Sequence, residues 1–182
     1  MIINSNQLLS ELNALVSSHI EEAKLFLTVT DDKLQNKINP ESWSVIECIE
    51  HLNLYAVFYN TEINKCLNNS TKVSEPNFKS GFLGNKFALD MLPKEGMKTM
   101  KTFKSKNPIH SKLDTKKVLT TFITYQEELL DLLEIAKDKN LTKNKTKITL
   151  PLLTFRLGDT FRFVIYHNQR HIVQAKRVLD SL

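Results

Sequence analysis

Apolar side chains recur every three or four positions along four long stretches of this chain, which is the spacing of an amphipathic α-helix. The stretches cover residues 5–27, 44–67, 115–138 and 158–182. No proline interrupts any of them, although proline occurs between them. Because proline breaks helix interiors, its absence supports four continuous helices. The pattern predicts an all-α fold, with residues 1–182 forming a single domain.

The second stretch has the most clearly marked start. Ser44 followed by Glu47 is a capping-box pattern, in which each side chain binds the other residue's backbone N–H. Trp43 and Cys48 occupy the two positions of a hydrophobic staple around the same helix end. At the third stretch, Thr115 is the predicted N-cap. These signals predict where the helices begin.

The connection between the second and third helices is much longer than the other two. It runs over residues 69–113, about 45 positions, and it holds three of the four glycines and three of the five prolines. A short helix is expected inside it, near residues 85–92. So long a link is unusual unless it crosses the bundle, and a crossover lets the second and third helices run parallel. The predicted architecture is therefore an up-down-down-up four-helix bundle.

Composition narrows the class of protein without indicating an activity. The hydrophobic fraction of 41% and the charged fraction of 25% are ordinary for a globular protein. No apolar run approaches the ~20 residues that span a bilayer, and the N-terminus lacks the pattern of a secretory signal. Cys48 and Cys66 would lie ~27 Å apart along one helix, too far for a disulfide. We therefore expect a cytoplasmic protein with reduced thiols and no membrane partner.

The net charge of +5 comes mainly from lysines in two predicted connections, residues 94–117 and 137–147. A basic connection can bind nucleic acid or an anionic substrate. It can also be a solvated surface without a partner. No nucleic-acid-binding motif accompanies the lysines, so we favour the solvated surface and expect no nucleic-acid partner.

Three histidines fall on the inward stripes of two predicted helices. His167 and His171 are four residues apart, which places them one turn apart on the same side of the fourth helix. His51 lies on the inward stripe of the second helix. Three imidazoles can hold a metal ion and leave a coordination position open. Three separate histidines with ordinary hydrogen bonds are the alternative, and their convergence on inward stripes favours the metal.

Several neighbours of these histidines are candidates for a supporting role. Glu47, one turn before His51, suits a ligand or a general base, but its capping-box role explains it better. Cys48 is interpreted as a small buried side chain rather than a thiolate ligand. Gln174, three residues after His171, either orients a ligand or ends the bundle. Arg170 either binds an anionic substrate or is a surface charge.

Two segments, residues 43–52 (WSVIECIEHL) and 167–174 (HNQRHIVQ), resemble the DinB-like superfamily of four-helix bundles. The resemblance implies the up-down-down-up topology and a divalent metal bound by His51, His167 and His171. Zinc or nickel is the expected metal, with iron or manganese as alternatives. Many members of the superfamily form homodimers, so a homodimer is expected here.

The resemblance implies a range of activities rather than one reaction. Some relatives are thiol-dependent S-transferases or isomerases, and others are regarded as metal-dependent hydrolases without a known substrate. The expected function is therefore that of a divalent-metal-binding enzyme, a transferase or hydrolase, acting on a small molecule, with a low-molecular-weight thiol as a candidate. The alternative is a non-catalytic metal-binding or stress-response module that dimerises.

Overall fold

The structure is a computed structural model that describes residues 1–94, 102–109 and 111–181. It is 64% helical, and its described residues form six α-helices and two small antiparallel sheets. The helices are α1 (Ser5–Phe26), α2 (Asp31–Gln35), α3 (Val45–Asn69), α4 (Phe82–Met91), α5 (Thr115–Ala136) and α6 (Leu157–Asp180). The strands are β1 (Ile2–Asn4), β2 (Asn77–Lys79), β3 (Lys145–Lys147) and β4 (Thr154–Arg156), and a 3₁₀ turn, η1, covers Lys104–Lys106.

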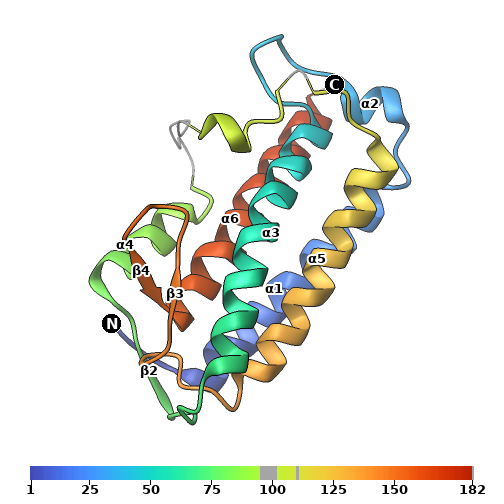
Figure 1. The fold of residues 1–182 in the computed structure, drawn as a ribbon. Coiled ribbons are helices and arrows are strands. Elements are labelled where there is room, and N and C mark those ends of the chain that lie inside the picture. The colour runs from blue at the N-terminus through green and yellow to red at the C-terminus, as the bar shows by residue number, and fades with distance from the viewer. Residues whose placement is uncertain (95–101, 110, 182) are drawn as a thin grey trace.

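The four long helices α1, α3, α5 and α6 are those that the periodicity predicts, and their ends lie close to the predicted ones. In space, α3 packs against α5 and α6, and α1 packs against the same two helices. Figure 1 shows that α3 and α5 begin at the end of the molecule where α2 lies, whereas α1 and α6 finish there. The last residue of the fourth predicted helix, Leu182, lies outside the described residues. None of the described helices is long and apolar enough to cross a membrane.

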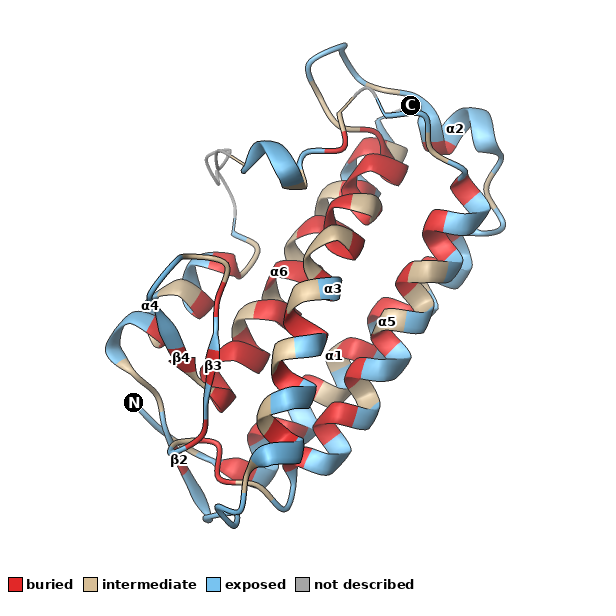
Figure 2. Cartoon of the chain, in the orientation of Figure 1, coloured by how far each residue is buried: buried red, intermediate tan, exposed pale blue. Residues whose placement is uncertain are grey.

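Each long helix buries the apolar stripe that its sequence predicts (Figure 2). The buried side chains form two apolar clusters, one at each end of the long helices. On α6, Phe161 and Ile165 belong to the first cluster, and Ile172 and Val178 belong to the second. The stretch between them carries His167 and His171, so these histidines lie where the apolar core changes from one cluster to the other.

Of the two helix caps that the sequence predicts, the one at α3 is confirmed and the one at α5 is wrong. Ser44 and Glu47 form the predicted capping box: Glu47 accepts from the Ser44 backbone N–H at 2.9 Å, and Ser44 Oγ accepts from the Glu47 N–H at 3.2 Å. The predicted cap at Thr115 is wrong by one residue. Asp114 caps α5 instead, because its carboxylate accepts from the Lys117 backbone N–H at 2.9 Å. Aspartate and threonine both cap well, so residue type alone does not choose between neighbours.

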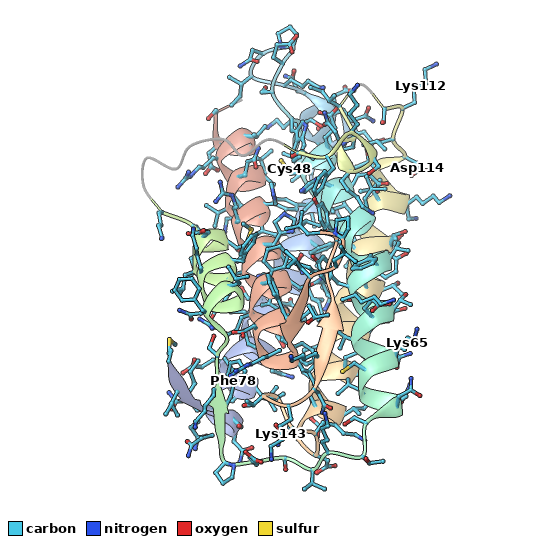
Figure 3. The ribbon with its side chains drawn as sticks, turned by 60° about the vertical axis from the view of Figure 1, so that its left-hand side comes forward. Cys48, Lys65, Phe78, Lys112, Asp114 and Lys143 are labelled. Atoms are coloured by element: carbon cyan, nitrogen blue, oxygen red, sulfur yellow. The ribbon has the colours of Figure 1, made fainter. Side chains whose placement is uncertain are left out.

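The described part of the long connection packs against the long helices. Its helix α4 overlaps the predicted short helix but begins three residues earlier, at Phe82, and ends one residue earlier, at Met91. Strand β2 pairs antiparallel with β1, with Phe78 opposite Ile3, and β3 pairs with β4. Figure 3 labels Phe78 on β2 and shows Lys65, Lys112 and Lys143 at the periphery. The sheets were not predicted, because strands of three residues are too short to show a period of two.

A buried ion pair fastens this connection to α6. Arg162, which is 1% exposed, donates to Asp159 at 3.2 Å and to Asn85 at 3.0 Å. The Asp159 carboxylate also accepts from the Gly81 N–H at 2.7 Å. A Cβ at Gly84 would lie 2.6 Å from the Asp159 side chain, so only glycine lets α4 approach this closely. The network fixes α4 beside the first turns of α6.

Candidate metal centre

The three predicted histidines meet between two helices that pack against each other. His51 comes from α3, and His167 and His171 come from α6. Each offers one ring nitrogen, and the three nitrogens lie within 4.8 Å of one another. The side chains are 2%, 8% and 9% exposed, respectively. The structure therefore brings together all three residues that the sequence singles out, and we call them the triad.

Hydrogen bonds fix the tautomers of two triad members. His51 Nδ1 lies 2.6 Å from the Lys106 carbonyl oxygen, and a carbonyl only accepts, so Nδ1 donates. His171 Nδ1 lies 2.9 Å from Gln174 Oε1 and donates to it for the same reason. In a neutral imidazole, a protonated Nδ1 leaves the lone pair on Nε2. His51 and His171 therefore each present Nε2 as an electron-pair donor.

One pair of ring nitrogens has the spacing of two ligands on a tetrahedral metal ion. His51 Nε2 and His167 Nε2 lie 3.2 Å apart. A tetrahedral ion with metal–nitrogen bonds of ~2.0–2.1 Å holds its ligand atoms about 3.3–3.4 Å apart. The observed distance is close to that value. The residues present thus fit the group that the triad would bind.

Burial keeps the triad neutral near pH 7. It lowers the pKa of His51 to about 4 and, together with the neighbouring His51, the pKa of His171 to about 3. The pKa of His167 lies well below its usual range, mainly through burial and then through its two histidine neighbours. The other charged groups that lower these pKa values are Lys106 and Arg170, both cations. A neutral imidazole is the form that binds metal.

Aromatic rings surround the triad. The Trp43 ring lies 4.6 Å from His51 and 5.6 Å from His171, and the Tyr55 ring lies 5.0 Å from both His51 and His167. These neighbours were missed as site residues. Tyr55 is four positions after His51, so helical spacing could have identified it. Trp43 precedes the helix, and its place beside the triad depends on tertiary packing.

The other predicted neighbours divide into contacting and distant residues. Gln174 contacts His171, as its spacing predicts. Glu47 caps α3, binds Lys37 Nζ at 2.7 Å, and does not join the group of three nitrogens. Cys48 is fully buried, and burial raises the pKa of its thiol, consistent with a packing role (Figure 3). Arg170 is half-buried, and its guanidinium donates to the Asp90 carbonyl at 3.3 Å.

One contribution to the site comes from the lysine-rich connection, which we interpreted as a solvated surface. That interpretation is wrong at Lys106, whose backbone carbonyl binds His51. The reason is topological, since η1 packs against α3 after the chain has left α4. Because the contact uses a backbone atom, no residue type in the sequence could have indicated it.

Comparison with known proteins gives one family. The DinB superfamily matches residues 14–175, a span that includes α3, most of α6 and all three triad members. No curated protein and no solved structure matches the chain. The triad is thus compatible with the divalent metal that the sequence resemblance implies.

Proposed function

Because this chain belongs to the DinB superfamily, we propose that it binds one divalent metal ion through His51, His167 and His171. The observation that carries the proposal is the convergence of three buried, neutral imidazoles within 4.8 Å. The compact group has no carboxylate among the described residues, and one divalent cation can accept the lone pairs of all three imidazoles. Among the residues that the structure describes, no other group of histidines, cysteines and acids is compact enough to do this.

The bundle that positions the triad is part of the same proposal. We infer an up-down-down-up four-helix bundle made of α1, α3, α5 and α6, with the long connection crossing between α3 and α5. The packing of α3 against both α5 and α6 supports this arrangement. In it, α3 and α6 are antiparallel neighbours, which is how bundle proteins bring ligands from facing helices to one metal.

Zinc or nickel is the proposed metal. The donors are three imidazole nitrogens, and the compact group includes no carboxylate among the described residues. Imidazole suits zinc, nickel and iron, whereas manganese prefers oxygen ligands. The donor set therefore favours zinc, nickel or iron over manganese.

Three protein ligands leave a coordination position for chemistry, so we propose a metal-dependent transferase or hydrolase acting on a small molecule. When bound, the metal lowers the pKa of a bound water or thiol and so supplies a nucleophile at neutral pH. The protein itself orients two of the ligands, because Lys106 binds His51 and Gln174 binds His171. The rings of Trp43 and Tyr55 exclude water from the metal centre. The positive charges of Lys106 and Arg170 favour an anionic ligand, such as the thiolate of a low-molecular-weight thiol.

A second candidate function is a non-catalytic metal-binding module. The low exposure of the triad, 9% or less for each histidine, favours it, because a structural site is closed to solvent. Chelation separates the two candidates. An apo protein that stays folded, together with thiol transfer to a halogenated acceptor, supports the enzyme. Unfolding on chelation without such activity supports the module.

The proposed setting follows from the resemblance and the free thiols. Cys48 and Cys66 are unpaired, which suits the reducing cytoplasm. We propose a homodimer, as in many members of the superfamily, and light scattering on the purified chain measures it. Nucleic acid is not proposed as a partner, and a binding assay at low salt tests this point.

Metal analysis of protein purified without a histidine tag tests the proposed function. We expect one equivalent of zinc or nickel per chain in the wild type and much less in His51→Gln. His19→Gln is the matched control, because His19 is also buried but lies outside the triad. Wild-type protein that neither retains nor takes up a divalent metal would contradict the proposal.

A further inference from the structure

A short segment of the long connection lies across the triad at two residues. We call residues 102–109 the strap. The Lys106 carbonyl accepts from His51 Nδ1 at 2.6 Å, and Asn107 Oδ1 accepts from the indole N–H of Trp43 at 3.0 Å. The Lys106 ammonium donates to the Leu54 carbonyl at 2.5 Å. Lys106 and Asn107 together therefore contact one triad member, His51, and two other residues of the same region, Trp43 and Leu54.

The partners of the strap are the groups that cover the triad. Trp43, which Asn107 binds, packs 4.6 Å from His51 and 5.6 Å from His171. The Lys106 ammonium also lies 5.5 Å from the centre of the Tyr55 ring, which contacts His51 and His167. The strap thus holds the two aromatic covers as well as one imidazole.

The strap is built to present these contacts together. Its η1 turn ends at Lys106, where the carbonyl meets His51. Asn107 Oδ1 accepts a second bond, from the Ile109 backbone N–H at 3.2 Å, so the same side chain shapes the turn and binds Trp43. Pro108 is buried against the protein. Loss of the Asn107 side chain therefore loosens the turn and the indole contact at the same time.

We propose that the strap is a cover over the metal centre whose docking is coupled to metal binding; this inference rests on the proposed function. A metal ion on His51 Nε2 withdraws electron density from the ring and makes Nδ1–H a stronger donor to the Lys106 carbonyl. The metal therefore tightens the docked strap. By reciprocity, the docked strap raises metal affinity by the same factor. Because the triad is at most 9% exposed with the strap docked, a small molecule reaches the metal when the strap lifts.

Limited proteolysis with trypsin tests the coupling, using zinc alone as the probe. The strap offers cleavage sites after Lys104 and Lys106, and Lys143, in the connection after α5, is an exposed reference site. We expect zinc to slow strap cleavage by about threefold to tenfold, the range of a strengthened hydrogen bond. Cleavage after Lys143 should not change. Equal slowing at both sites would indicate global stabilisation and would overturn the inference.

Variants of Asn107 distinguish an effect of the strap on zinc affinity from an effect on unfolding stability alone. Asn107→Ala should weaken zinc binding by about threefold to tenfold, measured by competition with a chromophoric chelator. Asn107→Asp keeps an acceptor for the indole and should restore most of the affinity. Trp43 is the only tryptophan in the chain, so its fluorescence reports whether the indole contact is broken. A structural role alone would lower unfolding stability and leave zinc affinity unchanged.

A double-mutant cycle identifies the contact responsible. Trp43→Phe keeps an aromatic ring beside the triad but removes the N–H donor. If Asn107 affects zinc affinity by way of its hydrogen bond to Trp43, the double variant should lose no more zinc affinity than the single variant with the larger loss. If the two losses of affinity add in the double variant, the hydrogen bond is not responsible. Zinc bound with unaltered strap cleavage would overturn the strap inference alone, whereas zero zinc stoichiometry would overturn the proposed function and the strap with it.

Discussion

Two buried polar clusters on α6 differ in what they contain. Near the start of the helix, the Asp159 carboxylate meets the Arg162 guanidinium, with further partners at Gly81, between β2 and α4, and at Asn85 on α4. Further along, the triad gathers three bases of one kind, and the charged groups that lower their pKa values are cations. The first cluster balances its own charge and needs no ligand. The second contains three neutral imidazoles and no carboxylate, a donor set that is compatible with a divalent metal.

His19 shows that burial of a histidine is not the deciding property. It is fully buried on α1, and burial lowers its pKa to about 4, much as for His51. Its Nε2 lies 2.8 Å from Gln169 Oε1, and among the described residues His19 does not belong to the compact group of three. The ion pair and the triad therefore differ in the chemical groups that meet in each cluster, and not in how deeply those groups are buried.

Breaking the ion pair should have the largest effect on stability. Asp159→Ala leaves the Arg162 charge buried without its carboxylate, which costs about 3–5 kcal/mol of unfolding free energy. Urea denaturation measures the loss. Zinc stoichiometry of the folded variant should stay at one per chain, because the triad is intact. A loss below about 1 kcal/mol would show that the pair contributes little to the fold.

Removing a triad member should weaken zinc binding and leave the fold intact, which is the reverse of the effect of breaking the ion pair. His167→Gln should weaken zinc affinity by more than about 100-fold, since even the loss of a group that merely orients a ligand costs 10–100-fold. The metal-free protein should keep its fold, as circular dichroism would show. Unchanged zinc affinity in this variant, with His19→Gln as the reference, would remove His167 from the site.

Weakening the orientation of one ligand should have a smaller effect. Gln174→Ala removes the acceptor from His171 Nδ1 and should lower zinc affinity by about 10-fold to 100-fold. Gln174→Glu retains an acceptor and should bind zinc at least as well as the wild type. Isothermal titration calorimetry measures both variants. If alanine and glutamate behave alike, Gln174 does not orient the ligand.

Acid should destabilise the metal-free protein through its buried histidines. The folded-state pKa values of His51 and His171, about 4 and about 3, lie below the unfolded value of 6.5, so the unfolded chain binds more protons. Stability is full above pH 6.5 and is lost as the pH falls toward 4 and then 3, by about 1.4 kcal/mol per pH unit for each histidine. Unfolding curves of chelated protein between pH 7 and 5 measure the slope. His51→Gln should show a shallower slope than the wild type, and an equal slope would contradict the assignment.

Helix periodicity and i,i+4 spacing predicted more of the site than of its surroundings. His51, His167, His171 and Gln174 are all on long helices, where sequence position fixes the face on which a side chain lies. The contacts from Trp43 and Lys106 come from parts of the chain outside the long helices. The positions of Trp43 and Lys106 depend on how the connection folds back onto the helices, and the hydrophobic periodicity of the sequence does not predict this. The same limit explains the cap at Asp114 and the three-residue strands.

The sequence by itself determined the four long helices, the inward faces of the triad residues and the family resemblance, because these depend on local periodicity and residue type. Only the tertiary structure decided that α3 and α6 bring the nitrogens within 4.8 Å, and that a lysine-rich connection returns to bind His51. Those facts depend on packing between segments more than 50 residues apart, as the separations of 55 for His51–Lys106 and 116 for His51–His167 show. A backbone carbonyl is present at every residue, so only the fold selects which one becomes part of the site.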